Sequence, residues 1–106
     1  MTKADDNTRL THMLEAAEKA LTFSHGKQRT DFDHDEILGL ALVRLLEIIG
    51  EAANRVSQDT QDQHSEIPWP KIVGMRNRLI HGYDVVDLDI LWQTLDQDLQ
   101  PLVDAL

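Results

Sequence analysis

The sequence contains no cysteine, which excludes disulfide bonds and thiolate metal sites and favours a reducing compartment. No apolar run approaches the ~18 residues needed to cross a bilayer, so we expect no transmembrane helix and no membrane partner. The polar N-terminus, MTKADDNTRL, lacks the apolar segment of a secretory signal. These absences make a cytoplasmic location the default expectation.

Positive charge is also scarce. The chain has 10 Lys and Arg residues against 19 Asp and Glu, and its net charge of −9 argues against a general nucleic-acid binder. The distribution is uneven, because residues 67–83 contain Lys71, Arg76 and Arg78 and no acidic residue. An anion would meet local positive charge there, while the rest of the surface would repel it.

What the sequence does contain is helical periodicity. A length of 106 residues with 42% hydrophobic residues is typical of one globular domain, residues 1–106. Apolar residues at spacings of three and four predict four helices, which run from Asn7 or Thr8 to Ser24, from Asp33 to Ser57, from Pro70 to His81 and from Asp87 onward. The polar stretch 57–66 is expected to be a loop. We therefore expect an all-α protein, an up-and-down four-helix bundle with room for an extra short helix.

Local signals set the expected helix ends. Asp33 and Glu36 form a capping box, Gly82 is a natural stop, and Pro101 should kink the last helix or end it early. The helix over 33–57 is apolar around most of its circumference. So short a chain has few other helices that could bury this apolar surface. The helix is therefore expected to be central, or to pack also against a second subunit.

Residues 76–83, RNRLIHGY, gather two arginines, a histidine and the single tyrosine of the chain. At about 100° per residue of helix, Asn77 and His81 share a face and can form a hydrogen bond, with Arg78 close to that face. Arg76 and His81 would lie about 140° apart by the same geometry. They can meet at one small group only if the helix ends or distorts near His81, or if a second subunit supplies the partner.

These residues suit phosphate chemistry. At a helix C-terminus the dipole favours protonated His81 while Arg76 and Arg78 oppose it, so His81 could act as a general acid or base. Arginine has the planar fork that fits a phosphodiester. Arg and His without grouped carboxylates match metal-independent RNA cleavage, in which the 2′-hydroxyl attacks the adjacent phosphate. The alternative is a solvated helix end, with Tyr83 as a half-buried aromatic residue.

At these positions the sequence resembles the HEPN superfamily and, within it, the HepT-like toxins of MntA–HepT toxin–antitoxin systems. The family signature is an Arg, a polar residue that is often Asn, three more residues and a His, extended in the HepT branch by one residue and a Tyr. Here these are Arg76, Asn77, His81 and Tyr83. The likeness covers nearly the whole chain and includes the segments RLLEIIGEAA (44–53), WPKIVGM (69–75) and VDLDILW (86–92).

The resemblance implies a helical bundle that forms a homodimer or a higher even oligomer, with two motif copies in one cleft as a composite ribonuclease site. Arg76 and His81 would be catalytic, with Asn77 supporting them and Arg78 attracting phosphate. The implied partners are RNA, tRNA included, and an MNT-type nucleotidyltransferase antitoxin that transfers AMP from ATP to Tyr83. That modification would place bulk and negative charge beside the site. No cofactor is implied.

Two further groups of polar residues lie outside this motif. The second helix carries a polar line that is either an intrahelical ion-pair ladder or, for its first two members, part of the cleft lining: Arg44, Glu47, Glu51 and Arg55. The remaining histidines lack the spacing of metal ligands, so we interpret them as surface residues and expect no metal site: His12, His25, His34 and His64.

Two other functions stay open at this stage. One is a non-catalytic helical subunit that presents a substrate or nucleotide to a minimal nucleotidyltransferase. The other is a four-helix interaction module without chemistry. The acidic net charge keeps the binding subunit open, whereas the intact set of Arg76, His81 and Tyr83 favours the ribonuclease.

Overall fold

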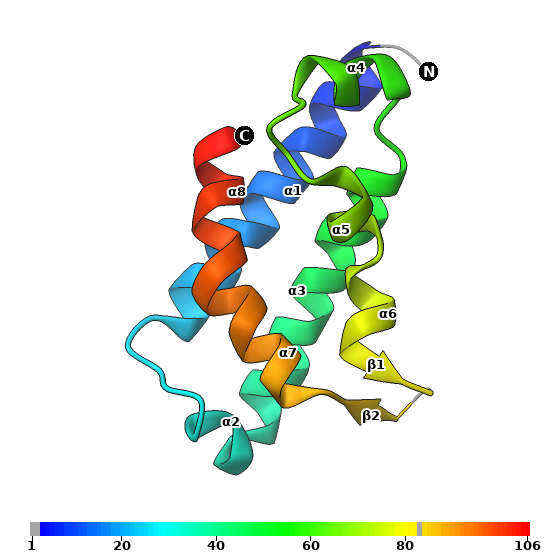
Figure 1. Cartoon of the computed structure of the whole chain (residues 1–106). Helices are drawn as coiled ribbons and strands as arrows, with labels where there is room; N and C mark the ends of the chain where they lie inside the picture. The colour runs from blue at the N-terminus through cyan, green and yellow to red at the C-terminus, as the bar shows by residue number, and fades with distance from the viewer. Residues whose placement is uncertain (1–2, 83) are drawn as a thin grey trace.

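The computed structural model describes residues 3–82 and 84–106, which form an up-and-down helical bundle. Two long antiparallel helices lie side by side at its centre, and two broken helices pack along them, each running opposite to the one before it (Figure 1). In chain order these are α1 (Lys3–Ser24), α3 (Glu36–Asn54), the pair α5 (Trp69–Val73) and α6 (Met75–Leu79), and the series α7 (Leu88–Gln93), the π-helical turn η1 (Thr94–Asp98) and α8 (Leu99–Ala105). The expected all-α four-helix bundle is confirmed.

Short elements join these segments. They are α2 (Asp31–His34), α4 (Gln58–Gln63) and the two strands of a hairpin, β1 (Ile80–His81) and β2 (Val85–Val86). The strands pair antiparallel, with His81 opposite Val85. Phe32 of α2 packs against Trp92 of α7, their ring centroids 5.8 Å apart, so α2 covers one end of the bundle. None of the helices in the described part of the chain is long and apolar enough to cross a membrane.

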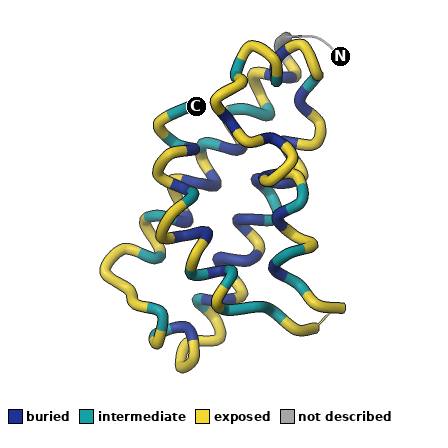
Figure 2. Tube along the Cα trace, in the orientation of Figure 1, coloured by how far each residue is buried: buried dark blue, intermediate teal, exposed yellow. Residues whose placement is uncertain are grey.

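Buried aliphatic residues from all four segments face the middle of the bundle (Figure 2). The large apolar side chains exposed by less than 2% are Met13, Leu42, Leu46, Ile49, Leu79, Leu91 and Leu99. Gly50 allows the third segment to approach α3 closely, because a Cβ atom there would meet the carbonyl oxygen of Ile72 at 3.2 Å. This contact holds α5 against α3, just before the chain enters α6.

One face of α3 is not covered by the described helices. The exposed fractions of Ile37 and Leu40 are 81% and 58%, although both are large aliphatic residues. The apolar pattern of this helix indicated more buried surface than the chain could supply for itself. The exposed residues lie at the start of the helix, near the β1–β2 hairpin, since Leu40 and Val86 line one shallow groove.

The predicted start of the second helix is wrong. α3 begins at Glu36 because Asp35, rather than Asp33, caps it. Asp35 has a non-helical backbone (φ −129°, ψ 84°), and its carboxylate accepts the N–H of Leu38 at 3.0 Å. That conformation separates α2 from α3, and α3 ends at Asn54, three residues before its predicted end.

The predictions for the first helix and for the loop also need correction. α1 includes Lys3 and so begins before the expected caps Asn7 and Thr8. The stretch 57–66 contains the helix α4, because the hydroxyl of Ser57 caps its first turn. The polar composition of this stretch indicated a loop, but the cap at Ser57 stabilises a short helix instead.

The predicted third helix, from Pro70 to His81, is broken twice. Gly74 separates α5 from α6, and the chain leaves α6 at Ile80, whose backbone is extended (φ −116°, ψ 121°). His81 therefore lies on β1, so the expected influence of a helix dipole on it is wrong. Gly82 follows with φ 73°, a left-handed conformation that favours glycine.

The fourth segment begins as predicted, and of the two expected effects of Pro101, a kink or an early end, the early end is wrong. Asp87 caps α7, its carboxylate accepting the N–H of Ile90 at 3.1 Å. Pro101 does not end the helix, which continues to Ala105. A proline ring clashes with the carbonyl group four residues earlier in an α-helix. That residue is Gln97, which lies in η1, where the wider π-helical turn does not require the hydrogen bond that Pro101 lacks.

Asp6 fastens α4 to the beginning of α1. The residue is 3% exposed, and its carboxylate accepts three hydrogen bonds, from the Ser57 hydroxyl at 2.6 Å, the Thr60 hydroxyl at 2.7 Å and the Ser57 N–H at 3.0 Å. These hydrogen bonds, the one from the Ser57 hydroxyl first, lower the pKa of Asp6 from 3.8 to about 2. The ionised form is therefore the one that the fold stabilises.

We expect Asp6→Ala to lower the melting temperature by roughly 5–10 °C at neutral pH, because two hydroxyl groups and an N–H lose their acceptor. The lowered pKa means that the contribution of Asp6 is complete above the unfolded value of 3.8 and is lost as the pH falls toward about 2. Thermal melts followed by circular dichroism from pH 7 to pH 2 should show the gap between wild type and variant narrowing in that window. A gap that does not change with pH would contradict this account.

Candidate functional site

The motif RNRLIHGY spans the change from α6 to the hairpin, at the edge of the bundle beside α3 and α7. Met75 and Leu79, at the two ends of α6, are 2% and 0% exposed and anchor this short helix in the core. Arg76 follows Met75 and lies on the exposed side. The helix has ended by His81, and this is one of the two conditions under which we expected Arg76 and His81 to serve one site.

Arg76 is tied to the central helix by one atom. Its Nε donates to Oε2 of Glu47 on α3 at 3.0 Å, and the side chains are 53% and 20% exposed. Within the described residues, the two terminal amino groups of Arg76 form no hydrogen bond. The guanidinium therefore has a fixed edge toward α3 and an open edge toward solvent, where a phosphate could bind.

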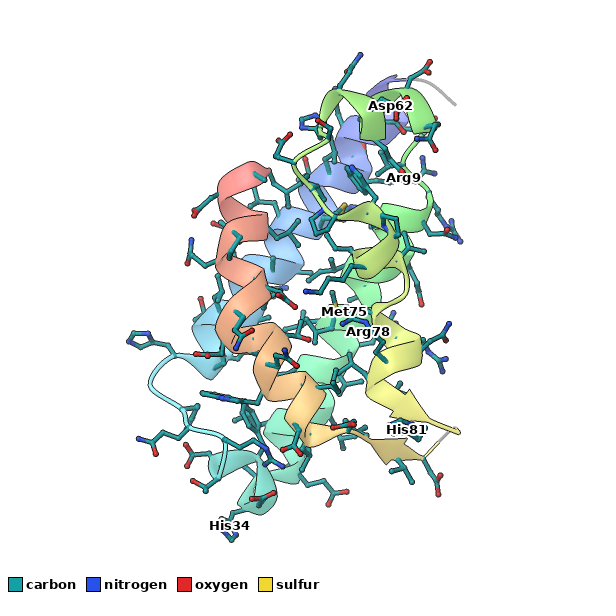
Figure 3. The ribbon with its side chains drawn as sticks, in the orientation of Figure 1. Arg9, His34, Asp62, Met75, Arg78 and His81 are labelled. Carbon is teal, nitrogen blue, oxygen red and sulfur yellow. The ribbon has the colours of Figure 1, made fainter. Side chains whose placement is uncertain are left out.

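His81 is held in a similar way from the other side. Its Nε2 lies 3.4 Å from Oδ2 of Asp87, and the His81 side chain is 61% exposed (Figure 3). The pKa of Asp87 lies below its usual value, first because the Ile90 N–H donates to it and also because His81 faces it, against partial burial. The charged carboxylate suits the tautomer with hydrogen on Nε2, which leaves Nδ1 as an acceptor.

The other members of the motif are placed differently from the expectation. Asn77 is exposed and forms no side-chain hydrogen bond within the described residues. Because His81 is on a strand, the expected helical contact between Asn77 and His81 is not formed. Nη2 of Arg78 donates to the carbonyl oxygen of Lys71 at 3.0 Å, and its side chain lines a cavity of about 120 Å³ between α5–α6 and η1–α8. Tyr83 lies outside the described residues.

The polar line on α3 is mostly not an intrahelical ladder. Glu47 pairs with Arg76 of α6 rather than with a neighbour on its own helix. Arg44 has a long contact with Glu51, 3.9 Å between Nη1 and Oε1. Among the described residues, no ion pair forms between Glu51 and Arg55. Arg44 and Glu47 thus lie on the same exposed face of α3, with Glu47 nearer the motif.

The contact between His81 and Asp87 is the part of the site that sequence reasoning missed. The sequence predicts a helix that begins at Asp87, and one carboxylate oxygen of Asp87 does cap α7, but the other faces the imidazole. The available sequence signal was an acidic residue six positions after the histidine with a glycine between them. This pattern could have indicated a hairpin that brings the two side chains together. In the described part of the chain, no group of three or more His, Asp or Glu residues is arranged to hold a metal ion.

Comparison with known proteins identifies the family. The family model described as ribonuclease HepT-like matches residues 13–106. A protein of Thermococcus cleftensis named "Probable ribonuclease HepT" is 39% identical over 93 residues, which cover 88% of this chain and 84% of that protein. Proteins named as candidate RNases in Caldanaerobacter subterraneus and Methanocaldococcus jannaschii are 39% and 33% identical, over 88% and 93% of this chain and 83% and 91% of their own lengths. No solved structure gives a significant match. The extent of these matches shows that the chain belongs to the HepT-like ribonuclease family of the HEPN superfamily.

Proposed function

We propose that the chain is a metal-independent endoribonuclease, with tRNA among its substrates and with Arg76 and His81 as catalytic residues. One observation carries the proposal: a carboxylate anchors one nitrogen of each of these exposed side chains, and within the described residues their other side-chain nitrogen atoms form no hydrogen bond. A solvated helix end needs no such anchors. A guanidinium held by Glu47 and an imidazole held by Asp87 are, in contrast, suited to a phosphodiester.

The chemistry follows from the open nitrogen atoms. Nδ1 of His81 takes the proton of the RNA 2′-hydroxyl, the 2′-oxygen forms a bond to the adjacent phosphorus, and the bond from phosphorus to the 5′-oxygen breaks. The imidazolium returns the proton to the departing 5′-oxygen, so the products end in a 2′,3′-cyclic phosphate and a 5′-hydroxyl. The terminal amino groups of Arg76 stabilise the negative charge on the phosphate oxygens. Asn77, which forms no side-chain hydrogen bond within the described residues, would support them once RNA is bound.

The proposed active form is a homodimer or a higher even oligomer that brings two motif copies into one cleft. Three large aliphatic residues support it, because Ile37, Leu40 and Val85 are 81%, 58% and 54% exposed beside the hairpin that carries His81. Burying them against a second copy would remove apolar surface from water. The exposed face of α3, with Arg44 and Glu47, would then line the cleft.

The proposed biological role is that of a cytoplasmic toxin whose partner is an MNT-type nucleotidyltransferase antitoxin. The antitoxin would transfer AMP from ATP to Tyr83, two residues after His81. The added phosphate is negative and would repel the phosphates of RNA beside the site. The support for this role is the family membership of the chain and the Arg-x4-His-x-Tyr spacing of its motif.

The direct test is to incubate the purified protein with tRNA and total RNA. We expect cleavage rates that agree within about twofold with and without excess EDTA, because no step uses a metal ion. The new ends should carry 2′,3′-cyclic phosphate or its hydrolysis products. Cleavage that EDTA abolishes and Mg²⁺ restores would contradict the mechanism.

The net charge of −9 favours a second candidate function, a non-catalytic subunit that presents a substrate or nucleotide to a minimal nucleotidyltransferase. The two functions separate in the same experiment. A protein that leaves every RNA intact, and whose expression without its genomic neighbour does not slow growth, would support the binding subunit.

A further inference from the structure

A groove of about 420 Å³ lies between the N-terminal half of α1 and the C-terminal half of α3, away from the cavity that Arg78 lines. It gathers a large share of the positive charge of an acidic chain. Its basic residues are Arg9 and His12 on α1, Arg44 on α3 and Arg55 directly after α3. Figure 3 shows Arg9 near the α4 end of the bundle, while His81 lies in the hairpin toward the other end.

Acidic residues offset this charge only in part. Asp5 and Glu51 also line the groove, so three arginines face two carboxylates. Arg44 is 61% exposed and reaches Glu51 at only 3.9 Å, and Arg55 forms no ion pair within the described residues. The neighbouring Asp6 is buried and directs its carboxylate to Ser57 and Thr60. Within the described residues, Arg55 thus brings to the groove a positive charge that no ion pair engages, and Arg44 has only one long contact.

Arg44 on α3 and Arg55 directly after it line the groove, and they lie on the same side of the helix as Glu47. At about 100° per residue, Glu47, Arg44 and Arg55 fall within roughly 80° of one another around the helix axis. Glu47 holds Arg76, and Arg44 is one turn from Glu47. From Arg44 to Arg55 the helix rises by about 16 Å, a distance that spans several nucleotides.

We propose that this groove binds the sugar–phosphate backbone of single-stranded RNA on one side of the bond that is cut. The inference rests on the proposed ribonuclease function, and it assigns to Arg55 and Arg44 the binding of phosphates remote from the reacting one. It also explains how a chain of net charge −9 holds RNA. Arg44 on α3 and Arg55 directly after it would contact phosphates from one side of the helix, although the chain as a whole is acidic.

The test measures binding without cleavage. A fluorescent single-stranded RNA with 2′-O-methyl groups, which lacks the attacking hydroxyl, is titrated with wild type and variants at several NaCl concentrations. We expect Arg55→Ala to raise Kd by roughly 3–10-fold at low salt and to reduce the slope of log K against log salt by about 0.7, the value for one lost phosphate contact. Arg55→Lys should retain most of the slope because it keeps the charge.

Lys27→Ala is the matched control, since it removes one exposed positive charge at the opposite end of α1, and it should change neither value. The proposed RNA-binding role of the groove is wrong if the Arg55→Ala protein melts like wild type and binds RNA with an unchanged Kd and an unchanged salt slope. The ribonuclease proposal would survive that result if wild type still cuts unmodified RNA and His81→Ala does not. If Arg55→Glu instead weakens binding of the cognate nucleotidyltransferase and leaves RNA binding intact, the groove is a protein-docking surface and the inference is wrong.

Discussion

His81→Ala is expected to slow RNA cleavage by roughly 10²–10⁴-fold, the usual contribution of a positioned general acid and base. The imidazole is 61% exposed on a two-residue strand, so its loss should not disturb the core. The measurement is single-turnover cleavage of a labelled RNA at saturating protein, with thermal melts to confirm the fold. Cleavage by His81→Ala at the wild-type rate would remove the imidazole from the mechanism.

Variants of Arg76 and Asp87 in the same cleavage assay separate the roles of the site residues. Arg76→Ala should cost roughly 10²–10³-fold through lost stabilisation of the phosphate, and Arg76→Lys should recover only part of that because lysine lacks the planar fork. Asp87→Asn keeps a good cap for α7 and removes the negative charge that faces Nε2 of His81. Asp87→Asn should decrease the cleavage rate by less than His81→Ala does, because the imidazole base is still present but less well oriented. Lys27→Ala again serves as the control for a lost positive charge.

Tyr83→Phe is expected to abolish modification by the antitoxin while leaving the protein toxic. The phenolic oxygen is the proposed acceptor of AMP, and phenylalanine offers none. Co-expression with the genomic neighbour followed by intact-mass measurement should show one or more AMP groups on wild type and no adduct on the variant. Growth in the same cultures should be rescued by the antitoxin for wild type and not for Tyr83→Phe.

A second variant separates regulation from catalysis. The His81→Ala protein retains Tyr83, so it should still accept AMP although it cuts no RNA. An adduct that persists on Tyr83→Phe would contradict the assignment of the acceptor. An antitoxin that rescues growth without any adduct would show that it acts by binding alone.

The class of fold was predictable because hydrophobic periodicity survives in each main segment. On α3 the pattern correctly marks Leu42, Leu45 and Ile49 as buried. The exposed Ile37 and Leu40 mark where the apolar pattern exceeds the surface that the described helices cover. The helix ends were less predictable, because capping depends on backbone angles that neighbouring residues share. Asp33 and Asp35 are both plausible caps in sequence, and only the extended backbone of Asp35 decides between them.

The placement of the candidate site residues in the fold was only partly predictable. The sequence indicated that a helix end near His81 was needed, and α6 does end at Leu79. It did not indicate that Asp87 would face His81, since that contact depends on the pairing of Ile80 with Val86 and on the turn at Gly82. A two-residue strand has too few residues to leave a pattern of its own. The contact of Arg78 with Lys71 was likewise hidden, because it crosses the break at Gly74.

The change from helix to strand between the motif arginine and histidine has a consequence for how the family's sequences can vary. Arg76 belongs to α6, whereas Ile80 and His81 belong to β1, where side chains alternate between the half-buried and the exposed side. Inserting or deleting one residue in the extended part would turn the imidazole toward the core, and a change of two would restore its direction. A length change of an even number of residues in this extended part therefore preserves the orientation of the imidazole. Whether family members keep the number of residues between the motif arginine and histidine even would thus indicate the strand, which the motif sequence alone does not show.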